Sequence, residues 1–354
     1  MEDKNNIQLI EDLIKKIVDT PNNSENYLQL ANLYLYQNEY ELAINVYESL
    51  LSFEKSNFIA LTNLGSLYFC KYDYYKAINY YSRAANLGVD NLSMYFNLGN
   101  AYAEVGEFRQ AMSNYIKALN MDKSNYQVYS AIALLYQDQS NYEEAAIYYD
   151  KALKLEPNIP ENYTNLAYVL LKLERNNEAI SLFKTALDIQ PDNSTIKLHY
   201  ANALSSNKDY KKSNKIYKSV IEENQSYYQA YICYGISLYE QDKVEKAIEM
   251  YNKAIEINPN IANAYMLLGN LYCTKQQNDI AIDYYKKVIE LEPANSNAYT
   301  LLGNTYVMSK DLRSAISAYK QAIDIEPDND ELKLIYIEII QEYINNREED
   351  NNAA

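Results

Sequence analysis

Two stretches of sequence, 34 residues apart, decide the fold. Residues 264–272 are AYMLLGNLY, and residues 298–306 are AYTLLGNTY. Each places a glycine, Gly269 or Gly303, inside an apolar segment, although a glycine in a helix costs about 1 kcal/mol relative to alanine. A glycine that returns at one phase indicates a packing role, because a missing side chain lets two backbones approach closely. The 34-residue period is therefore the unit from which the fold is predicted.

The same phase is occupied by a small residue along most of the chain. Stepping by 34 residues from Gly269 gives Ala31, Gly65, Gly99, Ala133, Ala167, Ala201, Gly235, Gly269 and Gly303. Twelve residues after each of these comes a second small residue, and we expect the two small positions to face each other. Four residues further on, every unit has an aromatic residue: Tyr47, Tyr81, Tyr115, Tyr149, Phe183, Tyr217, Tyr251, Tyr285 and Tyr319.

Helical periodicity occurs twice within each unit. In the unit that contains Gly269, apolar residues recur at i, i+3, i+4 and i+7 on both sides of the polar segment KQQND at 275–279. This pattern predicts a helix, a short turn and an antiparallel helix. Prolines at one phase end the units, where they stop a helix without the loss of an internal hydrogen bond. They are Pro157, Pro191, Pro259, Pro293 and Pro327.

The repeat gives the domain organisation. We expect an all-α, right-handed superhelical solenoid of antiparallel helix pairs, with nine repeats of 34 residues over 24–329. Residues 1–23 form a half repeat that caps the N-terminal end, and 330–346 form an amphipathic capping helix. Residues 347–354 are short, polar and charged, and are predicted to be a disordered tail.

These features together resemble the tetratricopeptide repeat family, whose repeat has about 34 residues. The resemblance covers 24–329, and the small, aromatic and proline positions keep their phase throughout. One difference is systematic, since the family favours tryptophan at a position where this chain, which has none, uses tyrosine. The resemblance implies that the first helix of each repeat lines a concave groove, which holds other proteins.

Asparagine recurs at two of the lining positions that the resemblance implies. The first position carries Asn63, Asn97 and Asn165, and the second carries Asn32, Asn100, Asn202, Asn270 and Asn304. An amide both donates and accepts hydrogen bonds, so a row of amides can pair with successive peptide units of an extended ligand. We expect these eight residues to bind a peptide. The alternative is that the amides bridge adjacent repeats or face water.

Charge restricts the partners. The chain has 48 acidic and 32 basic residues, a net charge of −16, which opposes binding to nucleic acid. The charged residues inferred to line the groove are mainly acidic and favour a neutral or basic segment. They are Glu25, Glu104, Asp138, Glu161 and Glu240 against Lys172.

Little in the sequence supports catalysis. The single histidine, His199, has no cysteine near it, and there is no phosphate loop, zinc spacing or nucleophile elbow. We therefore expect no enzyme activity, no cofactor and no metal. Three widely spaced cysteines favour a reducing compartment. No apolar run reaches the roughly 18 residues of a membrane span, so we expect a soluble, cytoplasmic protein that does not bind membranes.

The predicted function is that of a protein–protein interaction scaffold with an extended partner segment in its groove. Two alternatives stay open. One is a regulatory or targeting subunit of an enzyme carried on another chain. The other is a scaffold that assembles a complex through its outer face, with self-association possible through the terminal helices. The repeat at 194–227 is the least regular and the most basic, which fits either a solvated, weaker repeat or a hinge or second contact site.

Overall fold

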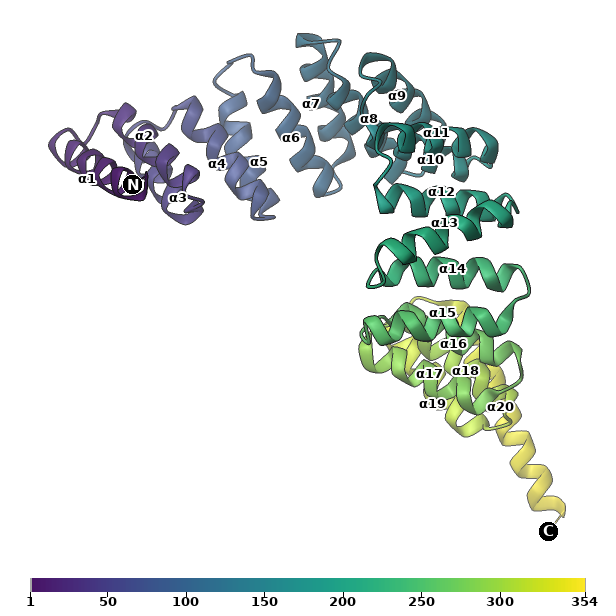
Figure 1. Ribbon diagram of the computed structural model, residues 1–354. Helices are drawn as coiled ribbons and strands as arrows, with labels where there is room; N and C mark the ends of the chain where they lie inside the picture. The colour runs from purple at the N-terminus through teal and green to yellow at the C-terminus, as the bar shows by residue number, and fades with distance from the viewer. Residues whose placement is uncertain (1, 354) are drawn as a thin grey trace. The chain divides into compact units, whose positions relative to one another are not determined.

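The computed structural model describes residues 2–353, and describes side chains for residues 6–346. Over these residues the chain forms twenty α-helices and no strand (Figure 1). The all-α fold class predicted from the sequence is confirmed. The first helix is α1 (Glu2–Asp19) and the last is α20 (Asp330–Ala353).

Between α1 and α20 the helices alternate in pairs, which we number repeat 1 to repeat 9. The first helices are α2 (Ser24–Tyr36), α4 (Phe58–Cys70), α6 (Leu92–Glu104), α8 (Tyr126–Asp138), α10 (Pro160–Lys172), α12 (Ser194–Ser206), α14 (Tyr228–Glu240), α16 (Ala262–Thr274) and α18 (Ser296–Met308). The second helices are α3 (Tyr40–Phe53), α5 (Tyr74–Ala85), α7 (Phe108–Met121), α9 (Tyr142–Leu155), α11 (Asn176–Ile189), α13 (Tyr210–Glu223), α15 (Val244–Ile257), α17 (Asn278–Leu291) and α19 (Leu312–Ile325).

The chain divides into two compact units, Met1–Ile189 and Gln190–Ala354. In each unit a helix packs against its partner in the pair and against the next pair. First helices of successive repeats approach each other more closely than the second helices do, at α4–α6 and α6–α8 in the first unit and at α12–α14 in the second. The first helices therefore line the inner side of each stack, and we call this surface the first-helix face.

The recurring glycine makes room for a tyrosine ring. A Cβ atom on Gly269 would lie 2.6 Å from Cε1 of Tyr285, and one on Gly99 would lie 2.5 Å from Cε1 of Tyr115. The closest atoms thus belong to the aromatic residue sixteen positions on, and the expectation that the small residue faces another small one is wrong in this respect. The eight tyrosines at this phase are among the largest fully buried side chains.

The turn inside each repeat contains one residue with a positive φ angle, always at the same phase. It is Gly106 in repeat 3 and a residue other than glycine in the other eight repeats, with φ between 57° and 63°. In repeat 9 the turn residue is Lys310, whose N–H donates to the carbonyl of Val307 at 2.9 Å. A left-handed residue of this kind satisfies the last carbonyls of the first helix, at a cost of about 1 kcal/mol when it carries a Cβ atom.

The segment 347–354, predicted to be a disordered tail, begins inside α20. Its side chains lie outside the described residues, so this expectation stays a prediction.

Lys310→Gly should stabilise the protein by about 0.5–1 kcal/mol, because glycine adopts a positive φ without a steric cost. Urea unfolding followed by circular dichroism measures the change. Gly106→Ala is the matched control: its φ is 77° and no atom lies within 4 Å of the added Cβ, so only the backbone is tested. It should destabilise the protein by a similar amount, and equal midpoints for all three chains would contradict the argument.

Candidate functional site

Five of the eight predicted asparagines accept a hydrogen bond from a buried tyrosine hydroxyl. In each case the tyrosine lies fifteen residues after the asparagine, on the second helix of the same repeat. The Oη–Oδ1 pairs are Tyr47–Asn32 at 3.0 Å, Tyr115–Asn100 at 2.8 Å, Tyr217–Asn202 at 2.7 Å, Tyr285–Asn270 at 2.7 Å, and Tyr319–Asn304. These amides satisfy hydroxyl groups that the burial of the rings carries away from bulk water.

Repeats 2 and 5 show how closely the amide and the hydroxyl are linked. Repeat 2 has Ser66 at the asparagine position, and its Oγ lies 2.8 Å from the hydroxyl of Tyr81. Repeat 5 has Tyr168 at the asparagine position, and its buried aromatic residue is Phe183, which has no hydroxyl. In repeat 2 a serine hydroxyl thus replaces the amide as the partner, and in repeat 5 there is no buried hydroxyl at this phase to satisfy.

Repeats 4 and 7 lack the asparagine and keep the tyrosine. In repeat 4 the asparagine position is Leu134, and the hydroxyl of Tyr149 donates to Oε1 of Gln137 at 3.4 Å instead. In repeat 7 the corresponding residues are Ile236 and Tyr251. The side chains at the asparagine position of these repeats, Leu134 and Ile236, are exposed apolar groups, so apolar positions interrupt the row of amides on the first-helix face.

Two asparagines of the first row, Asn63 and Asn97, hydrogen-bond a tyrosine of the preceding repeat. Nδ2 of Asn63 donates to the hydroxyl of Tyr47 at 2.8 Å, so this hydroxyl joins Asn32 in its own repeat to Asn63 in the next. Asn97 likewise hydrogen-bonds the hydroxyl of Tyr81. Asn63 and Asn97 therefore bridge adjacent repeats, which was the structural alternative to ligand binding.

The amides of the second row still offer hydrogen-bond donors. Asn32, Asn270 and Asn304 are exposed, and the tyrosine hydroxyls occupy their Oδ1 atoms. The hydroxyl fixes the orientation of each amide, and its NH₂ group is the part that remains for a ligand.

Two small pockets coincide with predicted residues. One, of about 170 Å³, lies between α4 and α6 and is lined by Ser66, Phe69, Cys70, Tyr81, Asn97 and Asn100. The other, of about 350 Å³, lies where α18 meets α20, and Asn304 is among its lining residues. The structure thus brings Asn97 and Asn100 together, whereas Asn165 stands exposed on α10.

On the first-helix face, one carboxylate raises the pKa of another. Burial, followed by the charge of Glu104, raises the pKa of Asp138. Burial and then the charges of the same two carboxylates raise the pKa of Tyr115. Glu104 ends α6 and Asp138 ends α8, so a positive group placed near them would relieve their repulsion.

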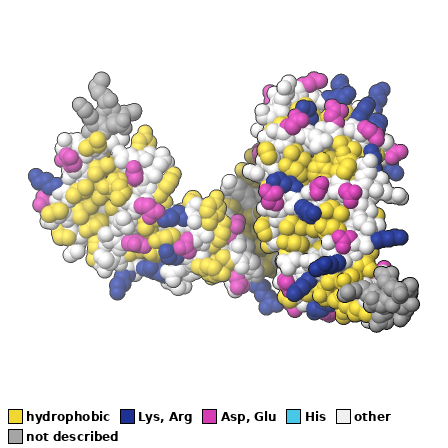
Figure 2. Space-filling view, turned by 90° about the horizontal axis from the view of Figure 1, so that it is seen from below, with side chains coloured by type: hydrophobic (Ala, Val, Ile, Leu, Met, Phe, Trp, Pro, Cys, Tyr) yellow, Lys and Arg dark blue, Asp and Glu magenta, His cyan; other side chains and the backbone are white. Residues whose placement is uncertain are grey.

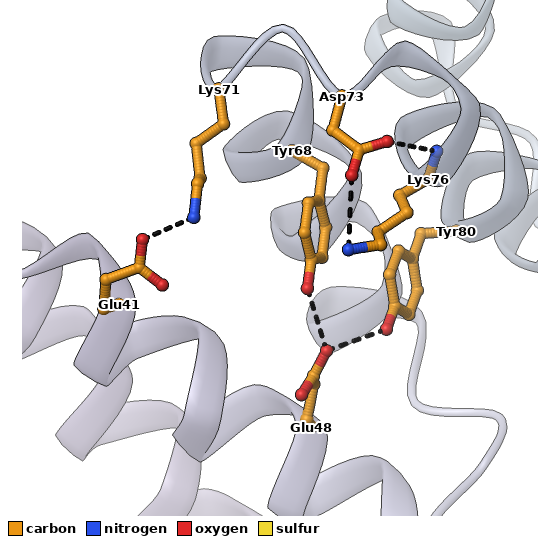
Figure 3. Close-up of polar contacts among 7 residues, drawn as sticks. All are labelled: Glu41, Glu48, Tyr68, Lys71, Asp73, Lys76 and Tyr80. Carbon is orange, nitrogen blue, oxygen red and sulfur yellow. Dashed lines mark hydrogen bonds and ion pairs between the residues drawn. The ribbon is translucent and has the colours of Figure 1, made fainter.

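Two further tyrosines have hydroxyls that join adjacent repeats. Oε1 of Glu48 on α3 accepts hydrogen bonds from Tyr68 on α4 at 3.0 Å and from Tyr80 on α5 at 3.1 Å (Figure 3). The two rings stack with their centroids 5.5 Å apart. A spacing of twelve residues between tyrosines, which recurs at Tyr136–Tyr148 and Tyr272–Tyr284, was the signal available in the sequence.

The surface mixes charges with apolar groups. Figure 2 shows acidic and basic side chains scattered among apolar patches on the face that it presents. Within the described part of the chain, no helix combines the length and the apolar character needed to cross a membrane.

Family models match the chain along almost its whole length. Tetratricopeptide repeat models match residues 28–91, 92–125, 126–159 and 260–327, and the model of the cytochrome c-type biogenesis protein H TPR domain matches 151–261. The chain belongs to the tetratricopeptide repeat family. No curated protein matches its sequence.

Solved structures show the same fold at low sequence identity. A chain of the APC/C hetero-tetramer Cut9-Hcn1 is 16% identical with a TM-score of 0.51, and the match covers 89% of this chain and 63% of that chain. A tetratricopeptide repeat protein from Parabacteroides merdae is 19% identical with a TM-score of 0.53, and the match covers 71% of this chain and 94% of that one. The repeats support a protein-interaction scaffold, and this fold is typically a non-catalytic interaction module.

The buried tyrosines should make the protein sensitive to alkali. Burial raises the pKa of all eight above the ordinary value of 10.0, and burial with the bond to Glu48 raises the pKa of Tyr68 to about 12. Above about pH 10 the unfolded chain loses protons that the folded chain keeps, so the free energy of unfolding falls as pH rises. Below that pH the contribution is fully present.

Urea unfolding at a series of pH values, with tyrosinate absorbance recorded in parallel, checks this dependence. The fall should begin near about pH 10 and should be shallower in Tyr285→Phe. A free energy of unfolding that stays constant through this range would contradict it.

Proposed function

We propose that this scaffold holds an extended segment of a partner protein along the first-helix face, in the order of its repeats within each unit. The observation that carries the proposal is the row of amides whose carbonyl oxygens are engaged by tyrosine hydroxyls at Asn32, Asn100, Asn202, Asn270 and Asn304. Each amide is held in one orientation. The NH₂ group of Asn202 donates to Sγ of Cys233, and those of the other four amides are preorganised to donate to a peptide carbonyl. Preorganisation lowers the entropic cost of binding.

The two rows have different parts in this proposal. Asn63 and Asn97 bond to tyrosine hydroxyls of the preceding repeat, and we assign them mainly to the joining of repeats. Asn100, Asn270 and Asn304 carry the pairing to the peptide. The pocket of about 170 Å³ between α4 and α6 is large enough for one side chain of the partner, and its rim residues Phe69 and Cys70 favour an apolar one.

The charge of the first-helix face determines which partner segments can bind to it. Glu104 and Asp138 are close enough for the charge of the first to raise the pKa of the second. A lysine or arginine of the partner would be attracted to this pair, and an acidic segment would be repelled. The partner segment is therefore neutral or basic. Three free cysteines favour a reducing, cytoplasmic setting for the complex.

Two substitutions of Asn100 separate its structural part from its binding part. Asn100→Asp keeps an acceptor for the hydroxyl of Tyr115 but removes the NH₂ donor, whereas Asn100→Ala removes both. The probe is a 12-residue peptide selected on the full chain from a random displayed library. We expect both variants to bind it at least tenfold more weakly, a loss of about 1.4 kcal/mol, and only Asn100→Ala to lose stability.

The control is Ile116→Ala on α7, a second helix, which changes an exposed side chain away from the first-helix face. It should bind the peptide as the unaltered chain does. The comparison is made with a neutral peptide and with one that contains lysine. If Asn100→Asp binds both as tightly as the unaltered chain does, the proposal is contradicted. Binding lost equally in the Ile116→Ala control would place the peptide on the outer face.

A further inference from the structure

A groove opens between the second helices α9 and α11, on the side of the stack opposite to the first-helix face. Its volume is about 660 Å³, and all of its lining residues lie in the unit Met1–Ile189. The lining is apolar at Ala146, Ile147, Leu166, Leu170, Leu173 and Leu182. The charged lining residues are Glu143, Asp150, Arg175 and Glu178.

This boundary lacks a pair of tyrosines that fills the corresponding place in several other repeats. Between repeats 1 and 2 the same place is filled by the stacked rings of Tyr68 and Tyr80, whose hydroxyls donate to Glu48 (Figure 3). Stacked tyrosines also occupy these positions in repeats 4 and 8. Three repeats, or 102 residues, after Glu48, Tyr68 and Tyr80 stand Asp150, Leu170 and Leu182.

The replacement changes both the shape and the chemistry of the boundary. Leucine is smaller than tyrosine and cannot donate a hydrogen bond, so Asp150 has lost the two donors that hold Glu48. It pairs instead with Lys154 of its own helix, at 2.5 Å. Ile147, which lies among the lining leucines, keeps 48% of its surface exposed. A contiguous apolar lining of this kind is typical of an interaction site.

The charges at the groove are unequal. Of the three lining carboxylates, that of Asp150 pairs with Lys154. Those of Glu143 and Glu178 are set against the single guanidinium of Arg175. That guanidinium is already occupied, since it donates to both carboxylate oxygens of Glu178 at 2.7 and 2.8 Å. The field at the groove therefore favours a positively charged partner.

We propose that the groove between α9 and α11 is a second docking site, which takes an amphipathic helix of a partner protein with lysine or arginine on its flanks. A helix that lies between two helices packs its side chains into the spaces between theirs. Apolar anchors at i, i+3, i+4 and i+7 would cover Ile147 and the leucines. The basic flanks would meet Glu143. This site is independent of the first-helix face and of its peptide.

The probe is a labelled 14-residue helix with leucine at i, i+3, i+4 and i+7 and lysine at the remaining positions, titrated with the full chain. A matched peptide carries glutamate in place of lysine. Fluorescence anisotropy should show that the glutamate peptide binds at least tenfold more weakly. Equal binding of the two peptides would overturn the assignment of a basic partner.

The double variant Leu170→Tyr, Leu182→Tyr closes the groove with the pair that this chain uses in repeats 2, 4 and 8. It should fold, because its residues are native to the same positions of other repeats, and should bind the lysine peptide at least tenfold more weakly. Circular dichroism confirms the fold. Undiminished binding by this folded variant would overturn the proposal.

A charge variant distinguishes the groove from general attraction to an acidic chain. Ile147→Glu adds a negative charge, so non-specific attraction would strengthen binding of the lysine peptide, whereas burial of its leucines in the groove requires at least a tenfold loss. The control Ile116→Glu adds the same charge at a boundary that Tyr136 and Tyr148 occupy, and its binding should stay within twofold. Binding that is unchanged or stronger with Ile147→Glu would overturn the proposal.

Discussion

The hydrogen bond between a buried tyrosine hydroxyl and an amide of the preceding helix is the interaction on which the rest of this structure depends. Glycine or alanine on the first helix leaves space for the ring, as the 2.6 Å approach at Gly269 and Tyr285 shows. The buried ring places its hydroxyl beside the first helix, where it needs a partner. Asparagine meets that need in five repeats, and the next repeat adds a second amide at Tyr47.

Tyrosine hydroxyls also determine the two surfaces. On the first-helix face they occupy the carbonyl oxygen of exposed asparagines such as Asn270 and fix the orientation of the amide. On the outer face a second set of tyrosines bonds to Glu48 and fills the boundary between repeats. Where repeat 5 has leucine in their place, the boundary opens into a groove.

The sequence predicts the helices well, because the small residue, the aromatic residue and the proline each recur at one phase. It does not predict what Gly269 faces, since residues twelve and sixteen positions on lie on the same side of the second helix. Nor does it predict that the carbonyl oxygen of Asn270 is already occupied, because that requires the distance between two helices. The replacement of Tyr68 and Tyr80 by Leu170 and Leu182 is visible in aligned repeats, but the groove that results is visible only once the rings are seen to stack.

A double-mutant cycle on Tyr285 and Asn270 tests the central interaction most directly. The free energies of unfolding of the unaltered chain, Tyr285→Phe, Asn270→Ala and the double variant would be measured in urea. If the hydroxyl and the amide act as one unit, the two losses are not additive, and the coupling energy is about 1 kcal/mol. If the two losses of unfolding free energy are additive, so that the coupling energy is near zero, the account is contradicted. The asparagine rows would then be surface features only.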